Sequence, residues 1–459
     1  MTSRRMGTPR PPRWSLPHGL AAAWDLDGYL RRRARHGDPF AVGFPGFPPV
    51  LFTGTADGAR ELFRIPVSLV RPPGPNPIEP MVGAASLILS SGSRHRTDRA
   101  LLAPALHGAR TKELAGVIRE ATLAELESGS GATGPWRIGS TIDALAAARS
   151  ITQRVILATA FGPTARATPD SARLRTDRAA EYAAAIGDFL ASFTTPLLAA
   201  PVLRRGPAGF GPWGRFVAAR ARLDRLIQRD IDRRRADGPG DGGLLDVLLT
   251  TRYADGATIT DTELREQLRT LLVAGHETTA TTLTWALYHL HREPGLCARL
   301  TAELANAPDD PEEQARLPLL GALCQETLRL HPPVPIVLRT LTEPWRWRGL
   351  DLPAGQTIGL AVGVLHSQRS TWPAPRLFHP DRFLDRKIGP FDYAPFGGGH
   401  RRCIGATLAE HELRVVLATL LTATELRLEP ALALGKRPRA VPRNLATAPG
   451  RPIRFVRVA

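Results

Sequence analysis

Residues 396–405, FGGGHRRCIG, place one cysteine among glycines and basic side chains, directly before a helix-like segment, ATLAEHELRVVLATLL. Such a loop could cradle a phosphate, carry a reactive thiol or hold a metal. A Walker-type loop needs Gly, four residues and then Gly-Lys-Ser/Thr, a register that is absent here; the dinucleotide pattern also fails, because Arg402 stands three residues after Gly399. A nucleophilic Cys403 would need a base, and His400, three residues away in a loop, is no evidence of a dyad.

A thiolate that binds a metal accounts for more of this loop. The glycines let backbone N–H groups approach the Cys403 sulfur, Arg401 supplies countercharge, and the following helix offers its positive end. Zinc or an iron–sulfur cluster would need more ligands, and Cys297 and Cys324 lie on predicted helices without ligand spacing. The loop therefore favours a metal that brings most of its own ligands, a description that fits haem.

A long helix is predicted from Thr260 onward. The stretch TDTELREQLRTLLVAGHETTATTLTWALYHLHREP opens with a capping box, Thr260 with Glu263, and contains no proline before Pro294. At 1.5 Å per residue, about 30 residues would give a helix of roughly 45 Å. Its flanks are apolar around most of the circumference, so we expect it to lie inside the protein.

The centre of this helix, AGHETT at residues 274–279, is unusual for a buried segment, which should prefer Leu or Ala. Ala274 and Thr278 share a face beside the missing side chain of Gly275, which predicts a groove flanked by the Thr278 alcohol and the Glu277 acid. Such a pair could relay protons to a group lying against the helix. The alternative is a solvent-facing turn.

A second candidate constellation is ionic. In QETLRLHPPVP, Glu326 and Arg329 lie three apart on one helix face, before His331 and Pro332 end the helix. An exposed pair of this kind would contribute little, but the flanking residues here are apolar. Arg382 stands in a proline-punctuated aromatic loop, WPAPRLFHPDRFLD, and would complete a shared network if it meets the pair.

The rest of the chain is expected to be mainly α with a small β subdomain. Residues 38–54 read as a β-hairpin, residues 71–80 as an ordered loop between two helices, and residues 94–250 are dominated by helical spacing. Short β-favouring runs follow at residues 345–366, and the final RPIRFVRVA alternates as an edge strand does.

Composition narrows the functional classes. The 459 residues are 43% hydrophobic and 22% charged, typical of a soluble globular protein, and carry a net charge of +17. The arginines are spread along the chain without any zinc-finger spacing or RNA-binding motif, so charge alone does not support nucleic-acid binding. Three cysteines suggest a reducing, cytoplasmic location, and no apolar stretch reaches the roughly 18 residues of a membrane span.

From about Asp25 to its end, the chain resembles the cytochrome P450 family. The cysteine loop matches its F-x-x-G-x-R/H-x-C-x-G signature, AGHETT matches its oxygen-binding helix motif, and the two arginines with Glu326 match its Glu-Arg-Arg network. The Arg-rich, proline-containing start of the chain predicts a basic flexible tail over residues 1–24, and the resemblance implies a single P450 domain over residues 25–459. In that domain a long central helix would lie over haem b, with Cys403 as the proximal iron ligand.

The resemblance also implies roles for individual residues. Two groups would act in catalysis by guiding protons, Glu277 and Thr278. Other positions would contact the cofactor, the propionate-binding ones being basic: His95, Arg99, Arg339 and Arg401, together with Ala274, Gly275, Phe396, Gly399 and Gly405. Glu326, Arg329 and Arg382 would form the structural network.

The implied activity is a haem-thiolate monooxygenase that inserts one oxygen atom from O2 into a small apolar organic substrate, by hydroxylation or epoxidation. Little chain follows Cys403, so electrons are expected from a separate ferredoxin or flavodoxin with its reductase. In similar proteins, the segments that correspond to residues 71–87 and 196–211 of this chain border the substrate. The chain is expected to be monomeric. A peroxide-using enzyme of the same fold and a non-catalytic haem sensor are the alternatives, and the acid–alcohol pair Glu277 and Thr278 disfavours both.

Overall fold

The computed structural model describes residues 18, 21–22, 24–43, 48–129, 134–162, 169–193, 203–207, 210–238, 243–253, 256–443 and 446–459. Most of the expected tail, residues 1–24, therefore lies outside the described part. His18, Ala21, Ala22 and Trp24 are helical, and Ala22 is buried. Most of residues 196–211 also lies outside it.

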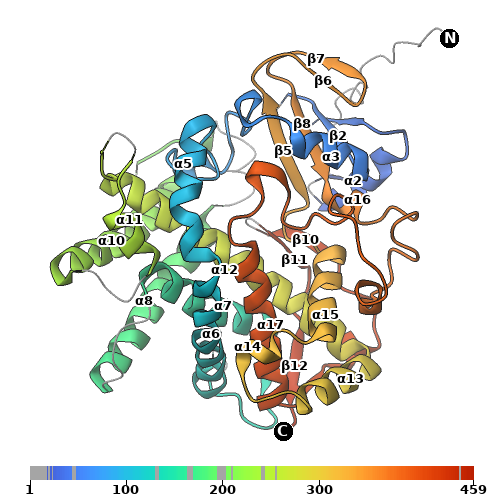
Figure 1. The fold of residues 1–459 in the computed structure, drawn as a ribbon. Coiled ribbons are helices and arrows are strands. Elements are labelled where there is room, and N and C mark those ends of the chain that lie inside the picture. The colour runs from blue at the N-terminus through green and yellow to red at the C-terminus, as the bar shows by residue number, and fades with distance from the viewer. Residues whose placement is uncertain are drawn as a thin grey trace.

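Helices make up most of the molecule, as predicted (Figure 1). The longer helices are α2 (Leu26–Ala34), α3 (Ala56–Arg64), α5 (Gly92–Leu102), α6 (Ala109–Ser128), α7 (Ala144–Phe161), α8 (Pro169–Ser192), α10 (Gly211–Asp237), α12 (Asp261–Arg292), α13 (Pro294–Ala305), α15 (Pro318–Leu330) and α17 (Ala406–Ala423). The shorter helices are α4 (Glu79–Val82), α11 (Leu244–Thr250), α14 (Pro311–Gln314), α16 (Val362–Leu365) and α18 (Pro430–Ala433). Short 3₁₀ turns include η4 (Pro380–Phe383) and η5 (Gly399–Arg401).

Helix α12 forms the centre of the helical body and packs against α7, α10, α15 and α17 (Figure 1). It begins as predicted: the Thr260 side chain accepts a hydrogen bond from the Glu263 N–H, and the Glu263 carboxylate accepts one from the Thr260 N–H at 2.8 Å. Residues 279–290 are all buried, so the second half of the helix belongs to the core.

The strands form small sheets beside the helical body (Figure 1). The largest sheet has the order β1-β2-β8-β5-β3, built from β1 (Phe40–Val42), β2 (Val50–Thr53), β8 (Thr357–Ala361), β5 (Ile336–Leu341) and β3 (Val70–Arg71). The predicted hairpin is confirmed, because β1 and β2 pair antiparallel. Two further antiparallel pairs are β6 (Trp345–Trp347) with β7 (Leu350–Leu352), and β10 (Ala440–Arg443) with β11 (Ala446–Pro449).

The prediction that the last residues form an edge strand is wrong. Strand β12 (Arg454–Arg457) is the central strand of a three-stranded sheet, between β4 (Thr141–Asp143) and β9 (Leu426–Leu428). Its alternating pattern fits a strand with one face on the core, and Phe455 is buried. The pattern along one strand carries no information on how many neighbours pair with it.

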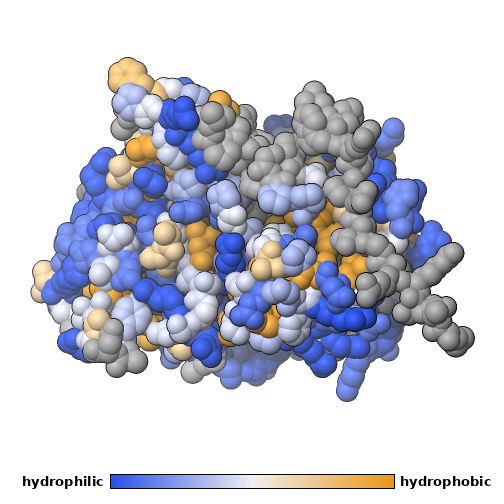
Figure 2. All heavy atoms as spheres, turned by 90° about the horizontal axis from the view of Figure 1, so that it is seen from above, coloured by the Kyte–Doolittle hydropathy of each residue, from blue (hydrophilic) through white to orange (hydrophobic). Residues whose placement is uncertain are grey.

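The surface mixes polar and apolar side chains. On the face seen from above, hydrophilic residues predominate, with hydrophobic patches between them (Figure 2). Within the described ranges, no helix is long and apolar enough to cross a membrane.

Two histidines, His289 and His366, are buried in the core, and a third, His331, is half-buried beside His289; none of the three has a carboxylate partner in the described part of the chain. His289 and His331 share a hydrogen bond of 2.9 Å between their Nε2 atoms, and His331 stacks on Trp285 with the ring centroids 3.7 Å apart. Burial lowers the pKa of His331 and of His366 to about 3, and that of His289 well below its usual value. All three are therefore neutral in the folded protein at neutral pH.

We expect acid to destabilise the fold well before its carboxylates are protonated. Between about pH 6.5 and the depressed folded-state pKa values, the unfolded chain binds protons that the folded chain rejects, so each histidine removes up to about 1.4 kcal/mol per pH unit as the pH falls. Urea midpoints at pH 7 and pH 5 measure this loss. His331→Phe, which keeps the stack on Trp285, should weaken the pH dependence; equal midpoints at both pH values for the unsubstituted protein would contradict the expectation.

Candidate functional site

The cysteine loop ends where α17 begins. The Cys403 N–H donates to the Phe396 carbonyl oxygen at 2.9 Å, and the backbone N–H of Gly405, the residue before α17, donates to the Cys403 sulfur. The side chain is accessible to solvent, yet surrounding protein atoms displace enough water to raise the pKa of its thiol, while the Gly405 hydrogen bond and Arg402 lower it. A bound cation would shift this balance to the thiolate.

The glycines of the loop serve its contact with α3. Gly397 and Gly399 have positive φ angles of 66°, which glycine adopts without strain. A Cβ atom on Gly398 would lie 2.3 Å from the Phe63 ring, and one on Gly399 would lie 2.3 Å from the Phe63 carbonyl oxygen. The sequence interpretation, in which these glycines open a path to the sulfur, is therefore incomplete: they also let the loop lie directly on Phe63, and the donor at the sulfur is the Gly405 N–H.

A group of basic side chains gathers beside this loop from three separate segments. We call it the basic cluster, and its members are His95 and Arg99 on α5, Arg339 on β5, and His400 and Arg401 on η5. The rings of His95 and His400 meet edge to face with centroids 6.0 Å apart. The structure thus brings together the four propionate-binding candidates and adds His400, to which the sequence assigned no role.

The surroundings of the basic cluster disfavour the charged forms of its members. Burial and the neighbouring arginines lower the pKa of both histidines to about 4, and burial lowers the pKa of Arg339 and Arg401 to about 10. Among the residues that the structure describes, three buried nitrogen atoms of the cluster have no hydrogen-bond partner, namely His95 Nδ1, His400 Nε2 and Arg401 Nε. No acidic side chain within the described ranges pairs with the cluster, so these residues fit a ligand that brings its own carboxylates, as haem does.

One face of α12 is accessible at its centre. Leu271, Ala274, Gly275 and Thr278 are partly exposed and lie at the spacing of a single helix face. The Thr278 hydroxyl donates to the Ala274 carbonyl oxygen at 2.7 Å. A Cβ atom on Gly275 would lie 2.7 Å from Ile156 Cδ1, so this glycine also allows α7 to approach.

The Glu277 side chain, next to Thr278 in sequence, points away from this face and toward α7. Glu277 is fully buried and forms an ion pair with Arg149 of α7, whose Nε donates to a carboxylate oxygen at 3.0 Å and whose second nitrogen donates to the other oxygen. The Arg149 side chain is 32% exposed and so connects this carboxylate to solvent. The expected groove flanked by both groups is therefore corrected: Thr278 lies on the accessible face, whereas Glu277 lies against α7.

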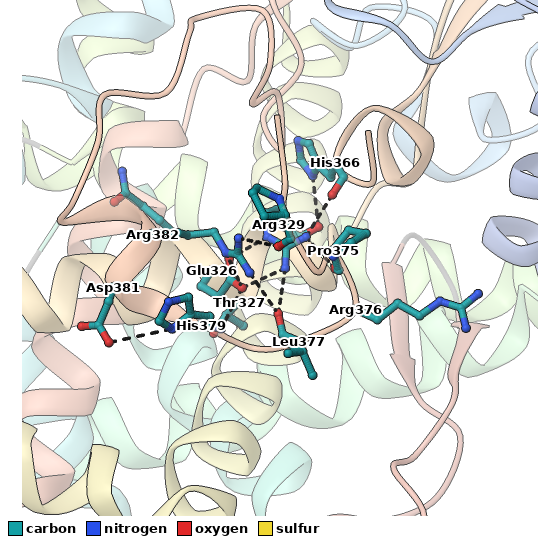
Figure 3. A network of polar contacts seen from close by, with 12 residues as sticks. Glu326, Thr327, Arg329, His366, Pro375, Arg376, Leu377, His379, Asp381 and Arg382 are labelled. Atoms are coloured by element: carbon teal, nitrogen blue, oxygen red, sulfur yellow. Dashed lines mark hydrogen bonds and ion pairs between the residues drawn. The ribbon is translucent and has the colours of Figure 1, made fainter. Parts of the chain in front are cut away.

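The predicted ionic constellation meets as a buried network (Figure 3). The Glu326 carboxylate accepts from Arg329 at 2.6 and 2.8 Å and from Arg382 at 3.1 Å. It also accepts the His379 N–H at 2.9 Å, while the arginines bind backbone carbonyl oxygens of residues 366–377. This network joins α15 to the loop that leads to the cysteine.

Comparisons with known proteins bear on the family of this chain. The model of the family described as Cytochrome P450 matches residues 29–441. The protein named "Putative cytochrome P450 135B1" of Mycobacterium tuberculosis is 34% identical over 448 residues, covering 95% of this chain and 88% of that one. "Putative cytochrome P450 138" of the same organism is 31% identical over 443 residues, 94% of this chain and 93% of that one.

A solved structure shares the fold. "Retinoic acid bound cyanobacterial CYP120A1" superposes with a TM-score of 0.81 at 23% identity, covering 98% of this chain and 99% of that one. Since the family model spans nearly the whole chain and relatives above 30% identity cover it, the chain belongs to the cytochrome P450 family and is a haem-b-binding monooxygenase.

Proposed function

We propose that this P450 inserts one atom of O2 into a small apolar organic substrate, by hydroxylation or epoxidation, with electrons from a separate ferredoxin or flavodoxin and its reductase. The observation that carries the proposal is that α12 presents Thr278 on its partly exposed face and, on its α7 side, the buried Glu277 carboxylate, which reaches solvent through Arg149. A sensor would not need such a path for protons.

The proposed cofactor contacts follow from the site. Cys403 would ligate the iron, the basic cluster would hold the two propionates, and Ala274 and Gly275 on α12 would border the ring, with Phe396, Gly399 and Gly405 shaping the cysteine loop. When bound, haem supplies the redox chemistry that activates dioxygen. The thiolate would be stabilised by the Gly405 N–H and by the end of α17.

Thr278 and Glu277 would move protons in two stages. Glu277 would take up protons on the α7 side of the helix, where Arg149 reaches solvent, and the Thr278 hydroxyl would deliver protons on the accessible face; transfer between these two sides of α12 is part of the proposal.

A fixed wall for the substrate is proposed at residues 81–87. Side chains of α12 hold this segment: Arg269 Nε donates to the Met81 carbonyl oxygen at 2.7 Å, and Gln267 Oε1 accepts the Leu87 N–H at 3.1 Å. Met81 and Leu87 are apolar, in keeping with an apolar substrate, although both side chains are packed in the core.

Basic residues near the cysteine support an acidic electron carrier. Arg402 and Arg96 are exposed, whereas Arg401 is directed at the Ile88 and Ser90 carbonyls and serves the basic cluster. Opposite charges would steer the carrier to this side, so electron transfer should slow as salt is added. A monomer in a reducing cytoplasm is proposed as well, consistent with its unpaired cysteines.

The test begins with the spin state of the ferric, haem-loaded protein, titrated with fatty acids, terpenes, steroids and macrolides, because a change of spin state would report binding near the iron without a redox partner. The compound that binds is then supplied with a surrogate ferredoxin, its reductase and isotopically labelled O2. We expect one labelled oxygen atom in the product. Product formed only with added peroxide, or no oxidation of any ligand that shifts the spin state, would contradict the proposal.

Thr278→Ala should leave haem bound but make product formation fall severalfold per NADH consumed, because protons no longer arrive in step with electrons. The ratio of product to NADH measures this coupling. Thr284→Ala is a matched control: its hydroxyl makes the same bond, 2.8 Å to the Ala280 carbonyl oxygen, but is buried. Equal coupling in Thr278→Ala and the unsubstituted enzyme would make Thr278 a purely structural residue.

A further inference from the structure

His366, the residue that follows α16, uses both ring nitrogens in hydrogen bonds to the backbone. Its Nδ1 lies 3.1 Å from the Arg329 carbonyl oxygen, and its Nε2 accepts the Ala394 N–H at 3.0 Å. The residue is 1% exposed. One imidazole therefore joins α15 to the segment that enters the cysteine loop.

These two contacts fix the proton on the ring. Since Ala394 offers an N–H, Nε2 must accept and carry no hydrogen, so Nδ1 carries it and donates to Arg329. A protonated ring would set two donors against each other at Ala394. Burial and the nearby charges of Arg329 and Arg31 lower the pKa of His366 to about 3, which keeps the ring neutral.

The contact between His366 and Arg329 runs in both directions (Figure 3). While the imidazole donates to the Arg329 carbonyl, the Arg329 guanidinium donates to the His366 carbonyl oxygen at 2.9 Å. Because Arg329 is itself held by Glu326, neither residue can shift without breaking buried bonds. His366 is therefore as firmly placed as the ionic network.

From Ala394 the path to the cysteine is short. The Ala394 carbonyl oxygen accepts the Gly397 N–H at 3.1 Å, and the Phe396 carbonyl oxygen accepts the Cys403 N–H at 2.9 Å. The neighbouring Tyr393 stacks on the His366 ring with centroids 5.3 Å apart. The entry of the loop is thus bonded to, and packed on, this imidazole.

We propose that His366 is a positioning residue for Cys403, which transmits the fixed geometry of the Glu326–Arg329–Arg382 network to the cysteine loop through its bond to the Ala394 N–H. The inference rests on the proposed role of Cys403 as the iron ligand. A merely space-filling histidine would tolerate any substitution that preserves packing, whereas a positioning role depends on an acceptor at the place of Nε2.

Two substitutions at His366 distinguish a positioning role from a space-filling role in the haem-loaded protein. In His366→Gln, the side-chain oxygen reaches the place of Nε2 and can accept the Ala394 N–H; in His366→Asn, the shorter amide reaches only the place of Nδ1. The readouts are hydrogen exchange of the Ala394 amide and the fraction of reduced, CO-bound protein with the red-shifted Soret band of thiolate ligation. His291→Phe is the control, because its Nδ1 also bonds a carbonyl, that of Leu287, on a distant part of α12.

We expect His366→Asn to exchange the Ala394 amide about tenfold faster and to lose part of the red-shifted band, because a buried donor is left without a partner. His366→Gln and His291→Phe should stay near the unsubstituted protein in both readouts. Equal behaviour of the Gln and Asn variants would overturn the proposal. Amide exchange follows the Ala394 bond whichever residue binds iron, so it distinguishes failure of this inference from failure of the Cys403 assignment.

Discussion

Cys403→Ala is expected to abolish the red-shifted Soret band of the reduced, CO-bound protein completely. The sulfur is the accessible thiol of the chain that sits before a helix start and receives a backbone N–H, from Gly405. Its thiol pKa is raised by the surrounding protein, so the thiolate would depend on the bound cation, and alanine offers no thiolate in its place. The band is measured on purified protein after reduction and exposure to CO.

The other cysteines serve as matched controls for this substitution. Cys324 is fully buried on α15 and burial raises the pKa of its thiol to about 12, so Cys324→Ala should retain the band. Cys297→Ala, on α13, should retain it as well. Persistence of the red-shifted band in Cys403→Ala would remove Cys403 as the ligand.

Glu326→Gln is expected to cost the protein most of its stability. The carboxylate is fully buried and accepts from two arginines and a backbone N–H, whereas an amide has a single acceptor oxygen and leaves both arginines uncompensated. Breaking a buried ion pair on one side costs about 3–5 kcal/mol. That loss is a large fraction of the roughly 5–15 kcal/mol by which domains are stable, so little folded, haem-bound protein should accumulate.

Urea unfolding and haem content of the soluble fraction measure this effect. Glu313→Gln is the control: Glu313 pairs with Arg316 three residues on, as Glu326 does with Arg329, but at side-chain exposures of 50% and 54%. Exposed pairs contribute about 0–1 kcal/mol, so the control should unfold close to the unsubstituted protein. If both variants lose equally little stability, the buried network does not hold the fold.

Local signals in the sequence predicted much of the fold. The start of α12 follows from the Thr260–Glu263 capping box, and the end of α15 from Pro332, because both act within a few residues. The contact of Arg382 with Glu326 could be expected from the sequence once both were placed in apolar surroundings. Charges in such surroundings are costly unless they are paired.

Features that depend on distant partners were not predictable in this way. The neighbours of β12 lie at residues 141–143 and 426–428, so its central place is invisible in its own pattern. Glu277 stands next to Thr278 in sequence, yet Arg149 of α7 draws it to the other side of the helix. His366 and His400 likewise gain their surroundings from remote segments, and no motif marks either of them.

If the basic cluster holds the haem propionates as proposed, the stability of the folded chain depends on cofactor supply. The cluster gathers buried basic groups with depressed pKa values and no acidic partner in the described part of the chain, an arrangement that costs electrostatic free energy unless an anion pairs with them. A ligand that binds only the native state stabilises it by mass action, about 2.7 kcal/mol at a hundredfold excess over its Kd. In a cell short of haem, the population that proteases can attack should therefore rise, and the abundance of this enzyme should report haem availability before transcription changes.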